Sequence, residues 1–159
     1  MIYSKTCEYA LRSLSYFVTN EKGAPATVAR ISRRVGVPGP YVAKIFQCLV
    51  HRGILESHRG ARGGYSLKVD PKKLTLIQVI RALDDLEKSP FSNCIMGLHA
   101  CNDNHPCPLH HVWMDAKERM LKKLSTHTIA DIADIVDQFE CGRCDRGTLS
   151  SEMRKIFAA

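Results

Sequence analysis

VPGPYVAKIFQCLVHRGILESHRGARGGYSL, residues 37–67, contains the signals of a helix, a glycine stop and a two-stranded hairpin in immediate succession. Pro38 suits the first turn of a helix, and the apolar residues after it recur at helical spacing. These apolar residues are Tyr41, Val42, Ile45, Phe46 and Leu49. Gly53 ends the helix, and residues 54–57 and 65–69 are strand-forming segments on either side of a glycine-rich tip. The stretch therefore predicts a helix followed by a β-hairpin.

A second, shorter helix is expected just before this stretch. Thr27 can cap its start and Gly36 ends it. Two short helices joined by a tight glycine-containing turn form a helix-turn-helix, whose second helix is the one that the major groove of DNA accepts. The hairpin tip, residues 58–64, carries two arginines that suit phosphates or a narrow minor groove. The sequence thus predicts a winged helix, a mainly α fold with a small β-hairpin wing.

The positive charge of the chain is concentrated in its first half. The net charge is +7, and residues 1–70 contain eleven Lys or Arg against four Asp or Glu, whereas residues 71–159 contain twelve of each. A basic half joined to a neutral half indicates a polyanion-binding module attached to a part that senses or dimerises. Charge alone would also suit a solvated basic face. Together with the winged-helix pattern, it favours binding to a double-stranded DNA operator.

We expect the second helix and the wing to contact DNA directly. Lys44 and Gln47 can donate to base edges, whereas Pro40 and Ala43 offer apolar contacts, for instance to a thymine methyl group. Affinity should fall steeply with salt, because phosphate contacts release counterions. The full set of expected DNA contacts is Thr27, Pro38, Pro40, Tyr41, Ala43, Lys44, Gln47, Arg59 and Arg62.

Three cysteines lie close together in a segment without regular patterning. Residues 93–113, NCIMGLHACNDNHPCPLHHVW, contain Cys94, Cys101 and Cys107, with His110 three residues further on. The Gly, Asn, Asp and Pro residues of this segment are loop formers. Thiols gathered in a loop indicate either oxidation or metal binding. Because the N-terminal segment is an amphipathic helix and not a signal peptide, we expect a cytoplasmic protein whose thiolates are available as ligands.

Two other classes of protein are disfavoured. No stretch reaches the roughly eighteen apolar residues that a membrane span needs. An enzyme with Cys94 or Cys107 as nucleophile and His110 as base would lack a recognisable carboxylate orienter and oxyanion-hole loop. We therefore expect no membrane insertion, no small-molecule substrate and no enzymatic activity.

Four motifs, in this order, resemble the bacterial IscR and NsrR regulators of the Rrf2 superfamily. They are YSKTCEYALRSL at residues 3–14, the quoted stretch at 37–67, LTLIQVIRAL at 74–83 and CPLHHVW at 107–113. The resemblance covers nearly the whole chain. It implies a homodimeric winged-helix transcription factor whose DNA affinity is set by an iron–sulfur cluster, with iron, redox state or nitric oxide as the signal.

The resemblance also implies a set of cluster ligands. Family members that carry a cluster hold it through three loop cysteines and one other residue, and the matching cysteines are Cys94, Cys101 and Cys107. The fourth ligand matches either His110, as in the IscR type, or Glu8 in the first helix, as in the NsrR type. Six residues separate Cys94 from Cys101, one more than in the IscR pattern, so the cluster type and fourth ligand stay open. A 2Fe–2S cluster is favoured over 4Fe–4S.

A long helix after the loop would pair the two subunits. Residues 109–124 carry an apolar stripe, which an internal core helix would show equally. The expected dimerisation residues are Val112, Trp113, Ala116, Met120 and Leu124. The expected organisation is a winged-helix domain (1–86), a cysteine-rich sensor loop (87–107), dimerisation and C-terminal helices (108–140) and a C-terminal tail (141–159).

The residues leave alternatives to a cluster open. Zinc suits a Cys3His set, although structural zinc sites favour cysteines two to four apart. A cluster-free regulator could instead use a thiol/disulfide switch, or sense a metabolite or a partner protein. Cys141 and Cys144 form a separate C-x-x-C in the tail, which suits a redox pair, half of a zinc site shared across a dimer, or a reduced tail without such a role.

Overall fold

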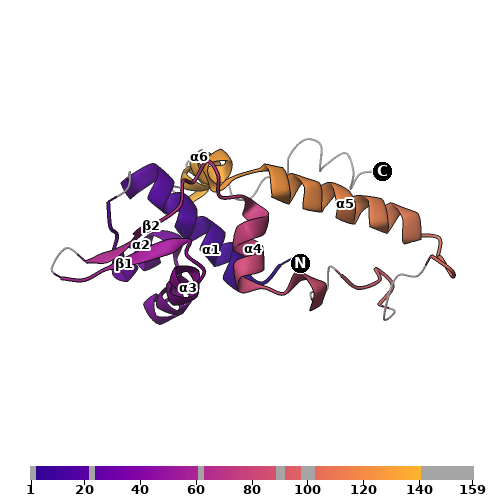
Figure 1. The fold of residues 1–159 in the computed structure, drawn as a ribbon, viewed down its shortest axis with the longest axis horizontal. Coiled ribbons are helices and arrows are strands. Elements are labelled where there is room, and N and C mark those ends of the chain that lie inside the picture. The colour runs from indigo at the N-terminus through magenta and orange to yellow at the C-terminus, as the bar shows by residue number, and fades with distance from the viewer. Residues whose placement is uncertain (1–2, 22–23, 61–62, 89–91, 98–102, 141–159) are drawn as a thin grey trace.

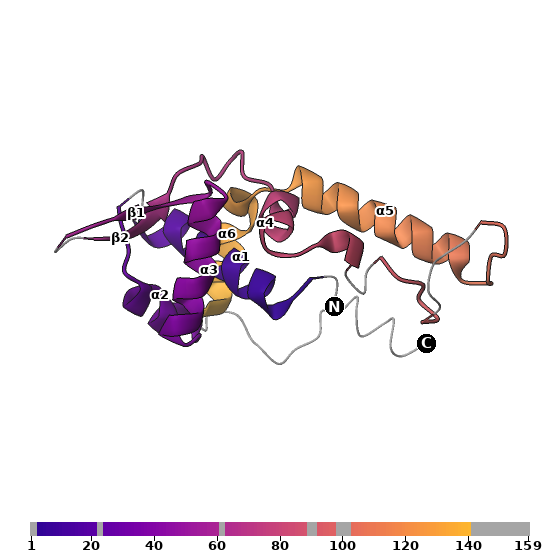
Figure 2. The same cartoon turned by 60° about the horizontal axis from the view of Figure 1, so that its bottom comes forward.

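One long helix extends away from a body made of short helices and a hairpin (Figures 1 and 2). The structure is a computed structural model that describes residues 3–21, 24–60, 63–88, 92–97 and 103–140. Within these ranges, no helix has the length and apolar character needed to cross a bilayer. The elements in chain order are α1 (Lys5–Tyr16), the π-helical η1 (Phe17–Glu21), α2 (Val28–Val35), α3 (Gly39–His51), β1 (Leu55–His58), β2 (Gly64–Leu67), α4 (Leu76–Leu83), the 3-10 helix η2 (Leu86–Lys88), α5 (His110–Thr126) and α6 (Ile129–Glu140).

Helices α2 and α3 form the predicted helix-turn-helix. The Thr27 hydroxyl accepts a hydrogen bond from the backbone N–H of Arg30 at 3.3 Å and caps α2. Gly36 ends α2 with a φ of 68°, the left-handed conformation that favours glycine. Pro38 is the N-cap of α3, and Pro40 lies in its first turn. The turn chemistry of the sequence thus fixes where both helices begin.

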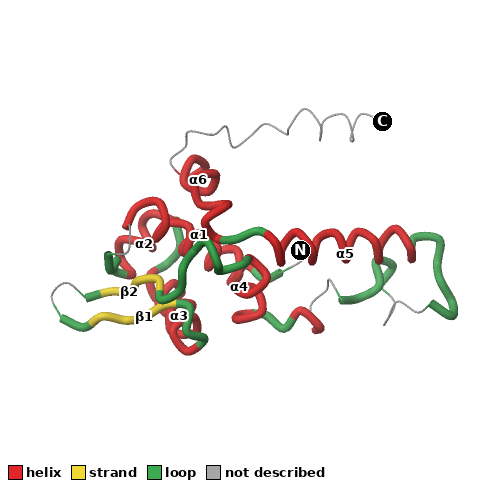
Figure 3. Tube along the Cα trace, turned by 45° about the horizontal axis from the view of Figure 1, so that its top comes forward, coloured by secondary structure: helices red, strands yellow, loops and turns green. Residues whose placement is uncertain are grey.

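The wing is an antiparallel pair of strands that Figure 3 shows side by side, extending beyond the helices. Its base also pairs with the segment before α2, because Ala26 and Tyr65 exchange two backbone hydrogen bonds of 2.8 and 2.9 Å. A Cβ atom on Gly64 would lie 2.5 Å from the carbonyl oxygen of Ala26. Only glycine permits this approach, so the Gly-Gly-Tyr sequence fastens the wing to the helix-turn-helix.

The hydrophobic core lies among α1, α2, α3 and the wing base. Phe46, Leu14 and Ile31 are fully buried there. Helix α6 packs on α1 and η1, and an ion pair of 2.5 Å joins Arg34 of α2 to Asp137 of α6. The last described helix is therefore part of the body and does not continue α5 outward (Figure 2).

The C-terminal end of α5 meets the body of the molecule at the start of α4. Thr75 and Thr128 form an isolated antiparallel bridge, and the N–H of Leu76 donates to the carbonyl oxygen of His127 at 2.9 Å. The C-terminal end of α5 is thereby fixed to the start of α4. Its N-terminal end and the described parts of the cysteine loop lie at the far end of the molecule (Figure 1).

The mainly α fold with a hairpin wing is thus confirmed. The strands begin and end within one or two residues of the predicted segments, and the long helix spans His110–Thr126 where the sequence predicted residues 109–124.

Candidate DNA-binding surface and cysteine loop

Helix α3 presents the predicted DNA contacts on one side. Its buried positions are Val42, Ile45, Phe46 and Leu49. The opposite side and the start of the helix carry Pro38, Pro40, Tyr41, Lys44 and Gln47, which are exposed, and Ala43, which is partly exposed. The structure therefore gathers these six residues on one surface, and their contact with DNA stays a prediction.

The sequence predicts Tyr41 both as one of the apolar residues of the second helix and as a DNA contact. In the structure, Tyr41 packs on α1 and is also partly exposed. Its ring packs edge-on against Tyr9 with centroids 5.8 Å apart, and its hydroxyl shares a 2.6 Å hydrogen bond with Thr6 of α1. Tyr41 remains 38% exposed. With Pro38 and Lys44 it lines a mostly apolar hollow of about 550 Å³ between α1 and the start of α3. Such a surface suits the methyl group of thymine, with Lys44 at its edge as a donor.

The other predicted contacts lie on α2 and the wing. Thr27 is exposed at the start of α2, and Arg59 is exposed just after β1. Arg62 lies outside the described residues. Sequence reasoning missed a polar network on the wing: the buried Ser66 hydroxyl donates to Glu56 at 2.9 Å and is 2.8 Å from His58 Nε2.

The Ser66 network has a signal in the sequence, because Glu56 and Ser66 are directly opposite once the hairpin register is known. It ties the two strands together close to the tip that carries Arg59.

Hydrogen bonds from α5 hold the first part of the cysteine loop, at residues 92 and 93. The indole N–H of Trp113 donates to the carbonyl oxygen of Asn93 at 3.0 Å, and Lys117 donates to the carbonyl oxygens of Ser92 and Asn93 at 3.1 and 3.2 Å. Asn93 directly precedes Cys94, which is buried. Trp113, predicted for a dimer stripe, thus contacts the cysteine loop of its own chain.

The end of the loop places His110 next to Cys107. Cys107 is half-buried, and its carbonyl oxygen accepts the backbone N–H of His110 at 3.0 Å. The His110 side chain is only 4% exposed, and its Nε2 atom lies 2.7 Å from Oδ1 of Asp103. Sequence reasoning missed Asp103, because a loop has no periodicity that would predict which side chains meet.

The remaining candidate ligands are more scattered. Glu8 lies on α1, where Lys5 and Arg12 pair with it at 2.7 and 3.9 Å. Cys101, Cys141 and Cys144 lie outside the described residues. Within the described ranges, no three His, Cys, Asp or Glu side chains are grouped closely enough to hold a metal ion.

The predicted dimer stripe on α5 divides into two sets. Val112, Ala116 and Met120 are exposed, Val112 at 69%. Leu124 is buried in its own chain, where it packs in a small cluster with Cys7, Ile77 and Ile80. The exposed set is available to a partner, whereas Leu124 holds α5 to α1 and α4.

The start of α1 is clamped to the end of α4. The backbone N–H and the hydroxyl of Ser4 donate to the two carboxylate oxygens of Asp84 at 2.6 and 2.8 Å. Burial alone would raise the pKa of Asp84, but these hydrogen bonds lower it below its ordinary value. Burial, with the neighbouring Asp84, raises the pKa of the Cys7 thiol to about 12. Cys7 is therefore an unreactive core residue.

A helix-turn-helix with an exposed second helix, a fastened wing and a basic first half together define a winged-helix DNA-binding protein. The Rrf2 family profile, described as an iron-dependent transcriptional regulator, matches residues 3–135. The chain therefore belongs to the Rrf2 family, and it is a DNA-binding transcriptional regulator of that family.

Its relatives are regulators and not enzymes. A protein of Aquifex aeolicus, named as an HTH-type transcriptional regulator, is 32% identical over 140 residues, which cover 87% of this chain and 95% of the relative. The regulator IscR of Yersinia pseudotuberculosis is 30% identical over 132 residues, 83% of this chain and 79% of the relative.

Solved structures confirm the fold. IscR of T. potens superimposes with a TM-score of 0.64 at 20% identity, covering 95% of this chain and 94% of that protein. CymR, the global cysteine regulator of B. subtilis, has a TM-score of 0.64 at 21% identity, covering 83% of this chain and 95% of that protein.

Proposed function

We propose that the protein is a homodimeric regulator that binds a near-palindromic operator, and that an iron–sulfur cluster held by the cysteine loop sets its DNA affinity. The observation that carries the proposal is the loop itself: it begins at a segment fastened to α5, contains the buried Cys94 and ends at the buried His110. The iron-dependent description of the family and the named relative IscR support it.

The donor set fits such a cluster. Thiolates are the usual cluster ligands, and an imidazole in one position raises the reduction potential. Cys94, Cys101 and Cys107 would supply the thiolates, and burial of Cys94 and His110 keeps water from the ligand atoms. A bound cluster would supply a redox-active centre that loss of iron or oxidation can remove.

His110 is the better candidate for the fourth ligand. It follows Cys107 by one helical turn, and Asp103 bonded to Nε2 would orient the ring and leave Nδ1 to bind metal. Glu8 is on another element and paired with Lys5.

The exposed face of α5 supports a dimer. Val112, Ala116 and Met120 recur every fourth residue, so they form one continuous apolar strip along the helix. Two copies of this strip across a two-fold axis would cover each other. The two α3 helices would then meet half-sites about 34 Å apart, one turn of DNA.

The cluster hypothesis is tested by absorption after anaerobic purification. Cys94→Ala, Cys101→Ala and Cys107→Ala should each lose the bands between roughly 320 and 450 nm that sulfur-to-iron charge transfer produces. Cys48→Ala is the matched control, because Cys48 lies on α3, where its thiol donates to the Ala82 carbonyl oxygen at 3.6 Å. Iron and sulfide analysis accompanies the spectra.

A colourless protein that contains zinc or no metal would contradict the cluster and favour a zinc or thiol switch. For the fourth ligand, His110→Ala should shift the spectrum or shorten the cluster's lifetime in air, and Glu8→Gln should not. The reverse result would move the ligand to Glu8.

DNA recognition is tested on operators selected from random DNA. Lys44→Ala should weaken binding by about 1–3 kcal/mol if it contacts a base edge, measured by fluorescence anisotropy. Replacing operator thymines one by one with uracil removes a single methyl group at a time. We expect a loss at the base that faces the Pro38–Tyr41 hollow, and Pro40→Ala should abolish that difference. A uniform response to every uracil would contradict the hollow's role.

A further inference from the structure

Two side chains of α5, Trp113 and Lys117, hold the backbone just before Cys94, and we call this pair the loop clamp. The indole N–H of Trp113 donates to the carbonyl oxygen of Asn93 at 3.0 Å. The ammonium group of Lys117 donates to the same oxygen at 3.2 Å and to the carbonyl oxygen of Ser92 at 3.1 Å. Hydrogen bonds from a charged donor are about twice as strong as neutral ones. The loop clamp therefore fixes the chain on the N-terminal side of Cys94.

The two residues of the loop clamp also support each other. The Nζ atom of Lys117 lies over the indole ring of Trp113, 5.1 Å from the ring centroid, a distance at which a cation is attracted to an aromatic face. The residues are four apart on α5 and so lie on neighbouring turns of one face. Both side chains are partly buried. Their mutual contact limits the freedom of both side chains, so less of it is lost when they bind the loop.

Cys94 is held from its other side as well. The backbone N–H of Gly97 donates to the carbonyl oxygen of Cys94 at 2.9 Å and closes a tight turn. Gly97 has a φ of 77°, a left-handed conformation that favours glycine. Ile95 and Met96 within this turn are 50% and 62% exposed, whereas Cys94 is 7% exposed. Among residues 92–97, Cys94 is the one buried residue.

The other end of the cysteine loop is attached to the same face of α5. His110 is the first residue of the helix, and its N–H donates to the carbonyl oxygen of Cys107. Trp113 and Lys117 follow it by three and seven residues, which is the spacing of one helix face. At a rise of 1.5 Å per residue, they lie about 4.5 and 10.5 Å further along the axis. The start and the end of the loop are thus attached within two turns of one helix.

We propose that Trp113 and Lys117 are positioning residues for Cys94: they hold its backbone at α5, the helix that begins at His110, before the chain binds metal. The inference rests on the proposed role of Cys94 as a cluster ligand. A ligand that is held in place beforehand loses less conformational freedom on binding, so the bound state is tighter. Neither clamp residue is itself a metal ligand, and both act through Cys94.

The first test measures how fast each cysteine of the reduced, metal-free full chain reacts with N-ethylmaleimide, by mass spectrometry of its peptides. A buried thiol reacts when its segment opens. Lys117→Met keeps the length of the side chain but removes its two hydrogen bonds to the loop. We expect Cys94 to react at least about tenfold faster in this variant, the factor that a hydrogen bond from a charged group contributes. Cys48 on α3 is the internal reference and should keep its wild-type rate.

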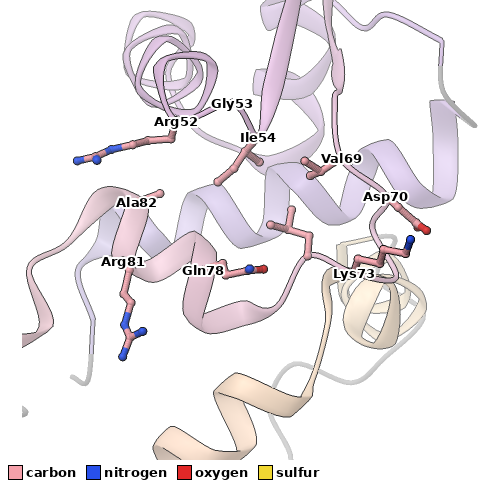
Figure 4. Close-up of a pocket in the computed structure, with 10 residues that line it drawn as sticks. Arg52, Gly53, Ile54, Val69, Asp70, Lys73, Gln78, Arg81 and Ala82 are labelled. Atoms are coloured by element: carbon pink, nitrogen blue, oxygen red, sulfur yellow. The ribbon is translucent and has the colours of Figure 1, made fainter.

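A conservative variant and two control variants accompany this measurement. Lys117→Arg should keep Cys94 close to its wild-type rate, because a guanidinium group also carries several donors and stacks on aromatic rings. Lys122→Met removes an exposed lysine of α5 that is not part of the loop clamp. Lys73→Met removes an exposed lysine that Figure 4 shows beside Asp70, at the edge of a hollow between the wing base and α4. Neither control should change the labelling of Cys94.

The fluorescence of Trp113 reports on the loop clamp directly, because it is the only tryptophan of the chain. Lys117→Met should increase quenching of this emission by acrylamide, since the indole is less covered once the loop segment opens. Trp113→Phe keeps an aromatic ring but loses the N–H donor. It should speed labelling of Cys94 less than Lys117→Met does, because it removes one neutral hydrogen bond. Circular dichroism checks that each variant is folded.

Equal labelling of Cys94 in the wild type and in Lys117→Met overturns the proposal. After anaerobic purification, Lys117→Met should lose its visible absorption in air about tenfold faster than the wild type, and Lys117→Arg at the wild-type rate. The same cluster lifetime in all three proteins also overturns the positioning role. A chain in which Lys117 protects Cys94 from labelling but which takes up no cluster would refute the proposed function and leave the hold on Cys94 supported.

Discussion

Replacing Gly64 by alanine should release the wing from the helix-turn-helix. Gly64 has a φ of +155°, and an added Cβ would lie 2.5 Å from the carbonyl oxygen of Ala26. The backbone strain costs about 1–3 kcal/mol, and the two hydrogen bonds between Ala26 and Tyr65 contribute about 1 kcal/mol each. The lower entropy of the unfolded alanine chain offsets about 0.4–1 kcal/mol. We expect a net loss of about 3 kcal/mol of unfolding free energy.

Gly60→Ala is the matched control. Gly60 also has a positive φ, +100°, but no atom lies within 4 Å of the position that its Cβ would take. It should therefore show the backbone strain alone, a net cost of about 1 kcal/mol. Urea unfolding followed by circular dichroism measures both, and Gly64→Ala should lower Tm by roughly 6–12 °C.

The same pair of variants tests whether attachment of the wing to the helix-turn-helix affects DNA binding. At a temperature where both are folded, Gly64→Ala should lose more operator affinity than Gly60→Ala, because the wing that carries Arg59 is no longer held against the segment before α2. Equal stability of the two variants would refute the close-approach argument.

Three further predictions concern the rest of the molecule. Hydrogen bonds from Ser4 lower the pKa of Asp84, so the ionised carboxylate stabilises the fold fully above its unfolded pKa of about 3.9. This stabilisation is lost as the pH falls through the lower pKa of the folded state. The free energy of unfolding, measured with urea from about pH 3 to 7, should therefore fall at the acid end, and Asp84→Asn should make that fall smaller. Val112→Glu and Met120→Glu should weaken self-association at least about tenfold in sedimentation equilibrium with unchanged circular dichroism, and a wild type that sediments as a monomer would refute the dimer. Leu124→Ala should cost about 2–5 kcal/mol of unfolding free energy through its buried contacts, and a surface-like loss near zero would contradict its place in the core.

Local signals in the sequence were enough to predict the helix-turn-helix and wing. Thr27 and Gly36 bound α2 as predicted, because capping and left-handed glycine act within one turn. Thr128 caps α6 through the same kind of local contact: its hydroxyl accepts the N–H of Asp131 at 3.3 Å, and its own N–H donates to the Asp131 carboxylate at 2.7 Å. The strand ends were predicted less closely: β1 (Leu55–His58) and β2 (Gly64–Leu67) differ by one or two residues from the predicted segments 54–57 and 65–69.

The long-range contacts had no such signal. Ser4 and Asp84 are 80 residues apart, and Arg34 and Asp137 are 103 apart, so no spacing in the sequence predicts that they meet. The apolar stripe on α5 was predicted, but such a stripe shows only which face of the helix is apolar. It does not show whether that face packs within the chain or against a second subunit. Leu124 therefore packs inside its own chain, although the same pattern had placed it at a dimer contact.

The bridge between Thr75 and Thr128 fixes one end of α5, so a small tilt of the helix there moves its other end much further. The helix is fixed at its C-terminal end and has 17 residues, so its other end lies about 25 Å from the fixed point at a rise of 1.5 Å per residue. Each degree of tilt at the bridge moves the His110 end by about 0.4 Å over that length. A tilt of about 5° therefore displaces that end by roughly 2 Å. A change in packing around Leu124 that tilted α5 would therefore move the cysteine loop several times further than it moved Leu124.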